Sequence, residues 1–119
     1  MKIETRKSGK IFILDIKGKI LLGEGTIMLR HSVEDAIKAG EKNIAVNLAE
    51  VSYIDASGIG ELVGVHTSVS KIKGNLLLLN PTGGIMDILR MTKLAAYFRI
   101  FYSETEMIKI VGKPFVRFG

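Results

Sequence analysis

Residues 51–63, with the sequence VSYIDASGIGELV, place a carboxylate, a hydroxyl and two glycines within six positions. Asp55 precedes Ser57 by two positions, and Gly58 and Gly60 follow, where an apolar segment gives way to a helical pattern. Three kinds of site have such residues: a nucleophilic serine, a phosphate-binding loop, and a hydroxyl that caps a helix or is itself modified. The neighbouring residues that each site requires distinguish between them.

A nucleophilic serine is not supported. The nucleophile elbow of hydrolases has glycine two positions before and two after the serine, where this chain has Asp55 and Ile59. A general base must come within about 3 Å of the hydroxyl. His66 lies about 13 Å further along the same predicted helix, so it cannot serve. His31, on another predicted helix, remains possible by position but is better explained as a surface residue. We expect His66 to be a packed, hydrogen-bonded histidine.

Metal and nucleotide sites lack their signatures. The chain has no cysteine, and its two histidines lie far apart without a metal-binding motif. Gly58 and Gly60 are followed by Val63, where a dinucleotide-binding loop has its third glycine, and no Walker-type phosphate loop occurs. We expect no metal and no cofactor. Binding of a nucleotide or small anion at the helix start remains an alternative without a supporting motif.

Two interpretations of Ser57 remain: a helix N-cap and a phosphorylated hydroxyl. A serine at a helix start commonly satisfies free backbone N–H groups. Gly58 and Gly60 each weaken a helix by about 1 kcal/mol relative to alanine, but they leave bare backbone that another protein could approach closely. A phosphoryl group would add up to about two negative charges beside Asp55, at a helix N-terminus that favours them. The residues alone do not decide between cap and switch.

Composition defines the class of protein. The 119 residues, 47% hydrophobic and 24% charged, indicate one globular domain, which we place at residues 1–119. No apolar run reaches the roughly 18 residues of a membrane span, and the N-terminus lacks the apolar segment of a secretory signal. The absence of cysteine fits a reducing compartment. We therefore expect a cytoplasmic protein without membrane association.

The net charge of +5 raises the question of nucleic-acid binding. The lysines and arginines are scattered, with no run of four, and aromatic residues make up only 7% of the chain. A solvated basic surface explains this pattern better than a nucleic-acid site. We expect no direct contact with nucleic acid, although a basic face could help to recruit an acidic protein partner.

The elements that position residues 51–63 alternate along the chain. Hydrophobic periodicity and turn residues predict strands over 3–7, 11–21, 42–51, 75–80 and 98–102, and helices over 27–39, 57–73, 82–94 and 103–111. This order predicts an α/β fold with a small mixed sheet of about 4–5 strands, flanked by about four helices. Functional loops of such sheets lie at the carboxyl ends of parallel strands, so a loop after 42–51 leads to Asp55.

Periodicity also predicts which helical side chains are buried. The helix over 27–39 has an apolar stripe of four residues: Ile27, Leu29, Val33 and Ile37. The helix over 57–73 has a stripe of five: Ile59, Leu62, Val65, Val69 and Ile72. Ser103 and Glu106 predict a capping box for the last helix. The tail at 113–119 is left unassigned.

The segment NLAEVSYIDASGIGELV, residues 47–63, resembles the central signature of STAS domains, specifically the stand-alone anti-sigma factor antagonists of bacteria. The downstream GNLLLLNPTGGIMDILRMTKLAAYFRIFYSETEMI, residues 74–108, fits the strand, helix, strand and helix that follow in this family. The resemblance implies a STAS-like α/β fold. It implies a binding function: the unphosphorylated protein binds an anti-sigma factor and frees the sigma factor. That anti-sigma factor is a serine kinase, and a PP2C-type phosphatase reverses its action.

The family's functional positions transfer to this chain by its motif. Ser57 matches the phosphorylated serine. The resemblance also implies a partner-binding surface that includes Asp55, Ala56, Gly58, Ile59 and Gly60. The protein is then a kinase substrate and binding partner and not an enzyme, and we expect a monomer or weak dimer. A STAS scaffold module of a stressosome-like complex is the alternative function.

The chain departs from the family pattern at two positions that are commonly acidic. Asn47 replaces an aspartate, which predicts a phosphoacceptor surface with one negative charge fewer. The segment GKIL, residues 18–21, ends in leucine where an acidic residue is common. Both departures concern partner recognition and phosphorylation; neither affects the predicted fold.

Overall fold

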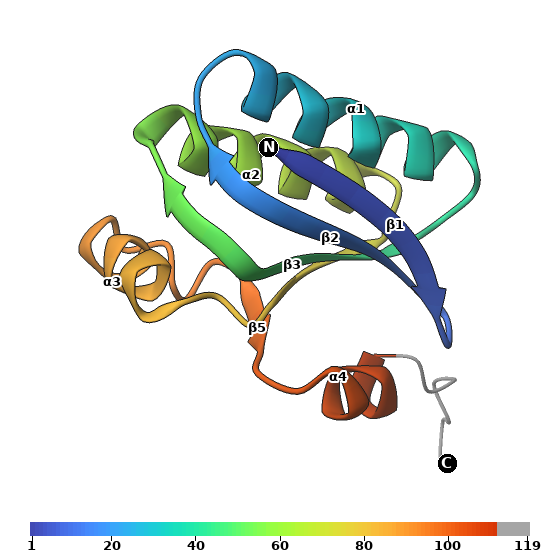
Figure 1. The fold of residues 1–119 in the computed structure, drawn as a ribbon. Coiled ribbons are helices and arrows are strands. Elements are labelled where there is room, and N and C mark those ends of the chain that lie inside the picture. The colour runs from blue at the N-terminus through green and yellow to red at the C-terminus, as the bar shows by residue number, and fades with distance from the viewer. Residues whose placement is uncertain (112–119) are drawn as a thin grey trace.

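The computed structural model describes residues 1–111, which form a five-stranded sheet and four helices (Figure 1). The strands are β1 (Lys2–Ser8), β2 (Ile11–Ile20), β3 (Asn43–Ile54), β4 (Asn75–Leu79) and β5 (Arg99–Phe101). The helices are α1 (Glu24–Lys38), α2 (Ala56–Lys71), α3 (Gly83–Met91) and α4 (Glu104–Val111). The predicted number and order of elements are confirmed. The tail at 113–119 lies outside the described residues.

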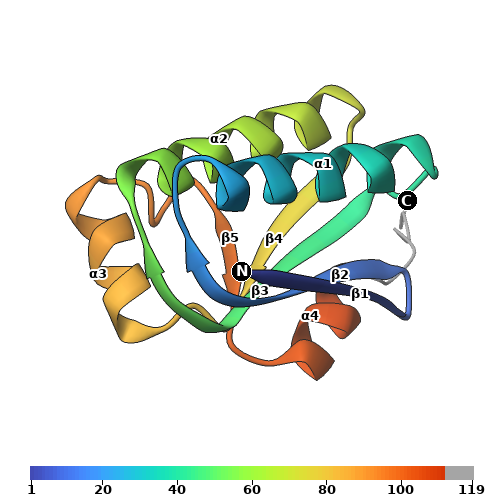
Figure 2. The same ribbon diagram turned by 45° about the horizontal axis from the view of Figure 1, so that its top comes forward.

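The sheet is mixed and has its strands in sequence order, β1-β2-β3-β4-β5 (Figure 2). β1 pairs with β2 in antiparallel orientation through a tight turn at Gly9, whose φ of 59° favours glycine. The remaining neighbours are parallel, because α1, α2 and α3 connect successive strands as crossovers. The segments predicted as strands over 3–7 and 11–21 thus form the opening hairpin, and the strand predicted over 98–102 lies at an edge of the sheet.

The two faces of the sheet are covered unequally. On one face, aliphatic residues of β2, β3 and β4 pack in one large core with α1, α2 and α3. On the other face a smaller core lies under α4 alone, where buried Met107 packs among Ile11, Ile13, Ala45, Leu77 and Leu79. Figure 1 shows α1 and α2 on one side of the sheet and α4 on the other. The sheet is thus the middle of three layers near α4.

β3 is longer than predicted, and the predicted loop before Asp55 does not exist. The strand continues to Ile54, which pairs with Ile20 of β2. Two register shifts in the β2–β3 pairing let both strands extend to this corner. Asp55 follows directly, and α2 begins at the next residue. The carboxyl end of β3 therefore positions α2 without a connecting loop.

The predicted apolar stripes are largely confirmed. In α2 the four residues Ile59, Leu62, Val65 and Val69 are buried, and Ile72 is the residue that ends the helix. α1 begins earlier than predicted, at Glu24, and this shifts its buried face. Thr26 is buried and Ile27 is 45% exposed, so the inclusion of Ile27 in the core stripe was wrong. At α4 the serine half of the capping box is present, since Glu106 N–H donates to Ser103 Oγ at 3.2 Å.

Candidate functional site

Asp55, and not Ser57, is the N-cap of α2. Its backbone is extended, with φ −90° and ψ 178°, and its Oδ1 accepts a hydrogen bond from Gly58 N–H at 2.7 Å. This is the bond that an N-cap side chain makes to the third residue of a helix. The interpretation of Ser57 as a cap was therefore wrong, because the aspartate two positions earlier already occupies that role.

The second oxygen of Asp55 fixes a neighbouring loop. Asp55 Oδ2 accepts the backbone N–H of Leu22 at 3.0 Å, and Asp55 N–H donates to Ile20 C=O at 3.2 Å. The N–H groups of Leu22 and Gly58 hold the pKa of Asp55 below its ordinary value, because they stabilise the charged carboxylate. One carboxylate thus joins the start of α2 to the end of β2 and the β2–α1 loop.

Ser57 occupies the second position of α2 and is half-buried, between exposed Ala56 and buried Gly58. Its hydroxyl makes no hydrogen bond to another residue within residues 1–111. The first turn of a helix presents free N–H groups and a positive dipole end, so negative charge is favoured there. The site can therefore hold a phosphoryl group on Ser57 without breaking an existing hydrogen bond of its side chain.

Gly58 and Gly60 have different surroundings. A Cβ atom on Gly58 would lie 2.6 Å from Ile20 C=O and 2.5 Å from Cγ1 of Ile54, so only glycine fits between β2, β3 and α2. A Cβ on Gly60 would meet nothing within 4 Å. Ile59 between them is buried and 6% exposed. Close packing within the domain explains Gly58, whereas nothing in the described fold requires Gly60.

His66 packs among aromatic side chains far along α2 from Ser57. Its ring lies 4.5 Å from the ring of Tyr97 and 5.6 Å from that of Phe98, both in the segment between α3 and β5. The predicted packing is confirmed, but the predicted hydrogen bond is not: His66 Nδ1 is buried without a partner among the described residues. His31 is exposed on α1, as predicted. Neither histidine contacts Ser57.

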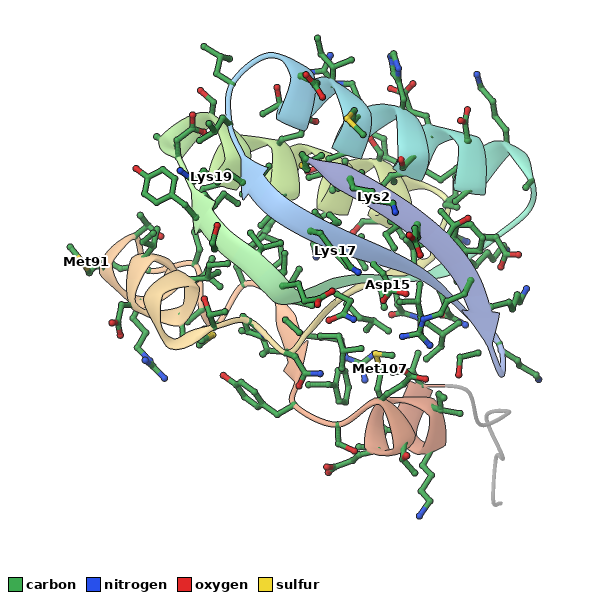
Figure 3. All side chains as sticks on the ribbon, in the orientation of Figure 1. Lys2, Asp15, Lys17, Lys19, Met91 and Met107 are labelled. Atoms are coloured by element: carbon green, nitrogen blue, oxygen red, sulfur yellow. The ribbon has the colours of Figure 1, made fainter. Side chains whose placement is uncertain are left out.

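Asn47 belongs to the opposite side of the sheet. Its Nδ2 donates to Asp15 Oδ1 at 2.8 Å, and Arg6 joins Asp15 to Glu104 of α4 through contacts of 2.6 Å to each carboxylate. Figure 3 shows Asp15 on the sheet face that α4 covers, near Met107. The prediction that Asn47 alters the charge of the phosphoacceptor surface was therefore wrong, because β3 continues for seven residues beyond it and turns Asn47 toward α4.

Arg6, Asp15, Asn47 and Glu104 form a polar network that links α4 to the β1–β2 hairpin. Arg6 lowers the pKa of Asp15 and of Glu104 below their ordinary values, with further hydrogen bonds from Asn47 to Asp15 and from Ser8 to Glu104. The same two carboxylates raise the pKa of Arg6, Glu104 more strongly than Asp15. The network is structural in its contacts and lies apart from Ser57.

A cavity beside Asp55 was not predicted from the sequence. It has a volume of about 370 Å³ and lies where β2 leads into α1, lined by Met1, Lys19, Leu21, Leu22, Glu24 and Gly25. Its wall residue Leu22 is the one that donates to Asp55. The signal that could have indicated it is the pair Leu21-Leu22, two large apolar residues at the end of the predicted strand over 11–21, before the helix predicted over 27–39.

Comparison with known proteins identifies the family. The sequence matches the STAS domain family over residues 2–107, and the chain belongs to this family. The protein TM1081 of Thermotoga maritima has a TM-score of 0.85 and 21% identity, covering 93% of this chain and 95% of its own. The anti-sigma factor antagonist SpoIIAA in its unphosphorylated form has a TM-score of 0.70 and 21% identity, covering 92% and 97%. These similarities confirm the STAS fold predicted from residues 47–63.

The same fold also occurs in a protein of a transporter family. A sulfate transporter family protein from Wolinella succinogenes has a TM-score of 0.74 and 21% identity, covering 86% of this chain and 84% of its own. Within residues 1–111, no helix has the length and apolar character to cross a membrane. The described residues also contain no cluster of three or more acidic or histidine side chains that could bind a metal ion.

Proposed function

We propose that this STAS domain is an anti-sigma factor antagonist whose partner binding is switched off by phosphorylation of Ser57. It acts in the cytoplasm as a binding partner and kinase substrate, not as a catalyst. The observation that carries the proposal is the state of the Ser57 hydroxyl: it is half-exposed at the start of α2, and Asp55 performs the capping that would otherwise engage it. A hydroxyl without a structural role is available for modification.

The proposed switch is electrostatic. A phosphoryl group on Ser57 brings up to about two negative charges beside the Asp55 carboxylate, while the N-terminus of α2 offsets part of that charge. The fold is retained and the surface around exposed Ala56 and Gly60 becomes strongly acidic. A partner that docks on the unmodified surface then loses affinity through charge repulsion and loss of contact.

The proposed partners follow from the family. An anti-sigma factor with serine kinase activity binds the surface of Asp55, Ala56, Gly58, Ile59 and Gly60, and a PP2C-type phosphatase removes the phosphate. SpoIIAA, which shares this fold, is known in unphosphorylated and phosphorylated forms, and this supports the proposal that the fold accommodates the modification. We propose a monomer or weak dimer, and light scattering that finds a large assembly would favour a scaffold.

Phosphate mapping tests the proposal. The protein is incubated with purified anti-sigma factor kinases of its own organism and ATP, and phosphopeptides are identified by mass spectrometry. We expect phosphate on Ser57 and none in Ser57→Ala. Ser68, an exposed hydroxyl further along α2, is the matched control, and Ser68→Ala should be phosphorylated like the wild type. Absence of phosphate from Ser57 with every kinase that binds the protein would contradict the switch.

Binding measurements test the consequence of the modification. By isothermal titration calorimetry, Ser57→Ala should bind the kinase like the wild type, and Ser57→Asp about tenfold more weakly, because the added charge opposes docking. Equal affinity of the wild type and Ser57→Asp would contradict the proposed mechanism.

A further inference from the structure

β1 forms an open edge of the sheet (Figure 1). It pairs with β2 over all seven of its residues, and within residues 1–111 no strand pairs with its other side. Natural proteins protect such edges by short strands, proline, bulges or charged side chains. β1 has no proline, and its register with β2 is unbroken, so only its charges can protect it from pairing with another chain. The opposite edge, β5, is protected by its length of three residues.

The backbone groups on this open edge follow from the geometry of the hairpin. A two-residue turn, Gly9-Lys10, joins Ser8 to its partner Ile11, and such a turn closes on a pair that exchanges both N–H···O bonds. Bonded and non-bonded pairs alternate along an antiparallel ladder, so every second residue of β1 directs its N–H and C=O groups away from β2. These outward residues are Ile3, Thr5 and Lys7. Their backbone groups have no partner within residues 1–111.

Only certain registers can pair β1 with β1 of a second copy about a two-fold axis. The two strands run antiparallel in one continuous sheet, and opposed side chains must lie on the same face, so the axis passes beside one residue of the strand. An axis at Thr5 pairs the whole strand, places the outward residues opposite one another and allows about six backbone hydrogen bonds. An axis at Glu4 or Arg6 brings two identical charges face to face, which is destabilising. An axis at Ile3 or Lys7 leaves part of the strand unpaired.

The side chains of β1 are complementary in the register centred on Thr5. Glu4 and Arg6 lie on the face that α4 covers, where Arg6 bonds Glu104. In this register Glu4 of each copy lies opposite Arg6 of the other copy, and on the other face Thr5 lies opposite Thr5. Opposite charges and paired threonines are both favourable across two strands. The charges that protect this edge from an unrelated strand therefore attract a second copy of β1.

We infer that β1 is a homodimer interface, in which two copies join their sheets through antiparallel β1 strands with Thr5 at the two-fold axis. Such an interface is isologous, so it closes after two copies and does not propagate into a fibre. Only one strand of each copy takes part, and we therefore expect a weak dimer with a Kd on the order of 100 μM. β2 lies between β1 and β3, the strand that leads to Ser57, so the inference does not rest on the proposed switch.

Hydrogen exchange of the wild type, measured by NMR, tests the interface directly. The amides of Ile3, Thr5 and Lys7 face the open edge, so their exchange should slow about threefold when the protein concentration rises from about 50 μM to about 1 mM. The amides of Glu4 and Arg6 bond β2 in every copy, and their exchange should change much less. Equal exchange of the three outward amides at both concentrations overturns the inference.

Sedimentation equilibrium of charge variants tests the pairing of side chains. Glu4→Arg places an arginine opposite Arg6 of the second copy, and we expect the Kd of the dimer to rise about tenfold. The matched control is Glu50→Arg on β3. Glu50 is 63% exposed and forms an ion pair with Lys17, as Glu4 at 59% exposure does with Lys2, so both variants make the same charge change. The control should dimerise within twofold of the wild type, and circular dichroism verifies that both variants fold.

A backbone variant tests the position of the axis. Thr5→Pro removes the outward N–H group there, and an edge strand tolerates proline where its N–H faces solvent. It should remain monomeric at concentrations at which the wild type dimerises. A wild type that is monomeric at about 1 mM, or a dimer that Glu4→Arg or Thr5→Pro leaves unchanged, shows that β1 is not the interface. None of these measurements includes the kinase, so the inference and the proposed function can fail separately.

Discussion

The carboxylate of Asp55 holds the backbone N–H of Leu22 at 3.0 Å, across 33 positions of sequence. Its other oxygen holds Gly58 N–H at 2.7 Å, so one side chain fixes both the loop that leads into α1 and the first turn of α2. Ser57 lies within that turn. The geometry of the candidate phosphoacceptor therefore depends on Asp55 more directly than on any other side chain of the described chain.

Asp55→Ala should lower the midpoint of thermal unfolding by about 4 °C, as loss of a helix cap does in a domain of this size. It should also slow phosphorylation of Ser57, because both the loop and the helix start lose their anchor. Circular dichroism and phosphorylation rates measure the two effects. Asp55→Asn retains one accepting oxygen for the cap but loses the second acceptor, so it should recover only part of the lost stability. Equal loss of stability in both variants would contradict the capping role.

Gly58→Ala and Gly60→Ala should have opposite effects on stability. At Gly58 the added methyl group meets backbone and side-chain atoms of β2 and β3, and such overpacking costs about 1–3 kcal/mol of unfolding free energy. At Gly60 the methyl group enters open space, and alanine's helix propensity should stabilise the protein by about 1 kcal/mol. Urea denaturation measures both.

The Gly58→Ala and Gly60→Ala variants also distinguish an effect on folding stability from an effect on partner binding. Gly60→Ala should bind the anti-sigma factor more weakly although it is more stable, since the proposed interface approaches bare backbone there. An affinity equal to that of the wild type would remove Gly60 from the proposed surface.

The polar network of Arg6, Asp15 and Glu104 predicts a loss of stability in acid. The folded-state pKa values of both carboxyl groups are lowered below their ordinary 3.8 and 4.5. Their stabilising contribution is therefore complete above about pH 4.5 and is lost as pH falls through the lowered values. Arg6→Leu should reduce unfolding free energy at pH 7 by about 1 kcal/mol, because water screens these half-exposed groups.

Thermal melts between pH 2.5 and pH 7 test this dependence. The difference between wild type and Arg6→Leu should shrink as the carboxyl groups become protonated. Lys2→Met removes the ion pair that lowers the pKa of Glu4, but water screens this exposed pair, so the pH profile should change much less than in Arg6→Leu. A constant difference across the pH range would show that Arg6 stabilises the fold through packing alone.

Asn47→Asp should disturb stability and not phosphorylation. The change removes the donor that binds Asp15 at 2.8 Å and places a second carboxylate there, which should lower unfolding free energy by about 1–2 kcal/mol at pH 7. Ser57 lies beyond the far end of β3, so its phosphorylation rate should remain that of the wild type. A marked change in that rate with unchanged stability would contradict the placement of Asn47.

Local patterns in the sequence predict the fold well where one element determines its own boundaries. The apolar stripe of α2 repeats at helical spacing, and Gly9 interrupts the two strands predicted over 3–7 and 11–21, so the helix and both strands were correct. The predicted end of β3 was wrong. Polar Ser52 ends the apolar run, and Tyr53 beyond it belongs to the strand because it pairs with β2, which the local sequence does not show. Strand length here is decided by the partner strand.

For the candidate site, too, the local sequence predicts some features and contacts between distant segments decide the others. Its residues follow from the motif, but the roles of Asp55 and Ser57 depend on which of two suitable capping side chains the backbone favours. The position of Asn47 depends on strand bulges and on the side that α4 covers, and the aromatic neighbours of His66 come from residues about 30 positions away. Contacts between distant segments have no signal in one sequence.

The ion pair of Arg6 with Glu104 has a consequence for the order of folding. It joins residues separated by 98 positions, so it can form only after the intervening chain has been brought together, at the entropic cost of closing that loop. α4 itself is eight residues long and buries one side chain completely. We expect this helix to assemble last and to open first, with the fastest amide hydrogen exchange of the four helices.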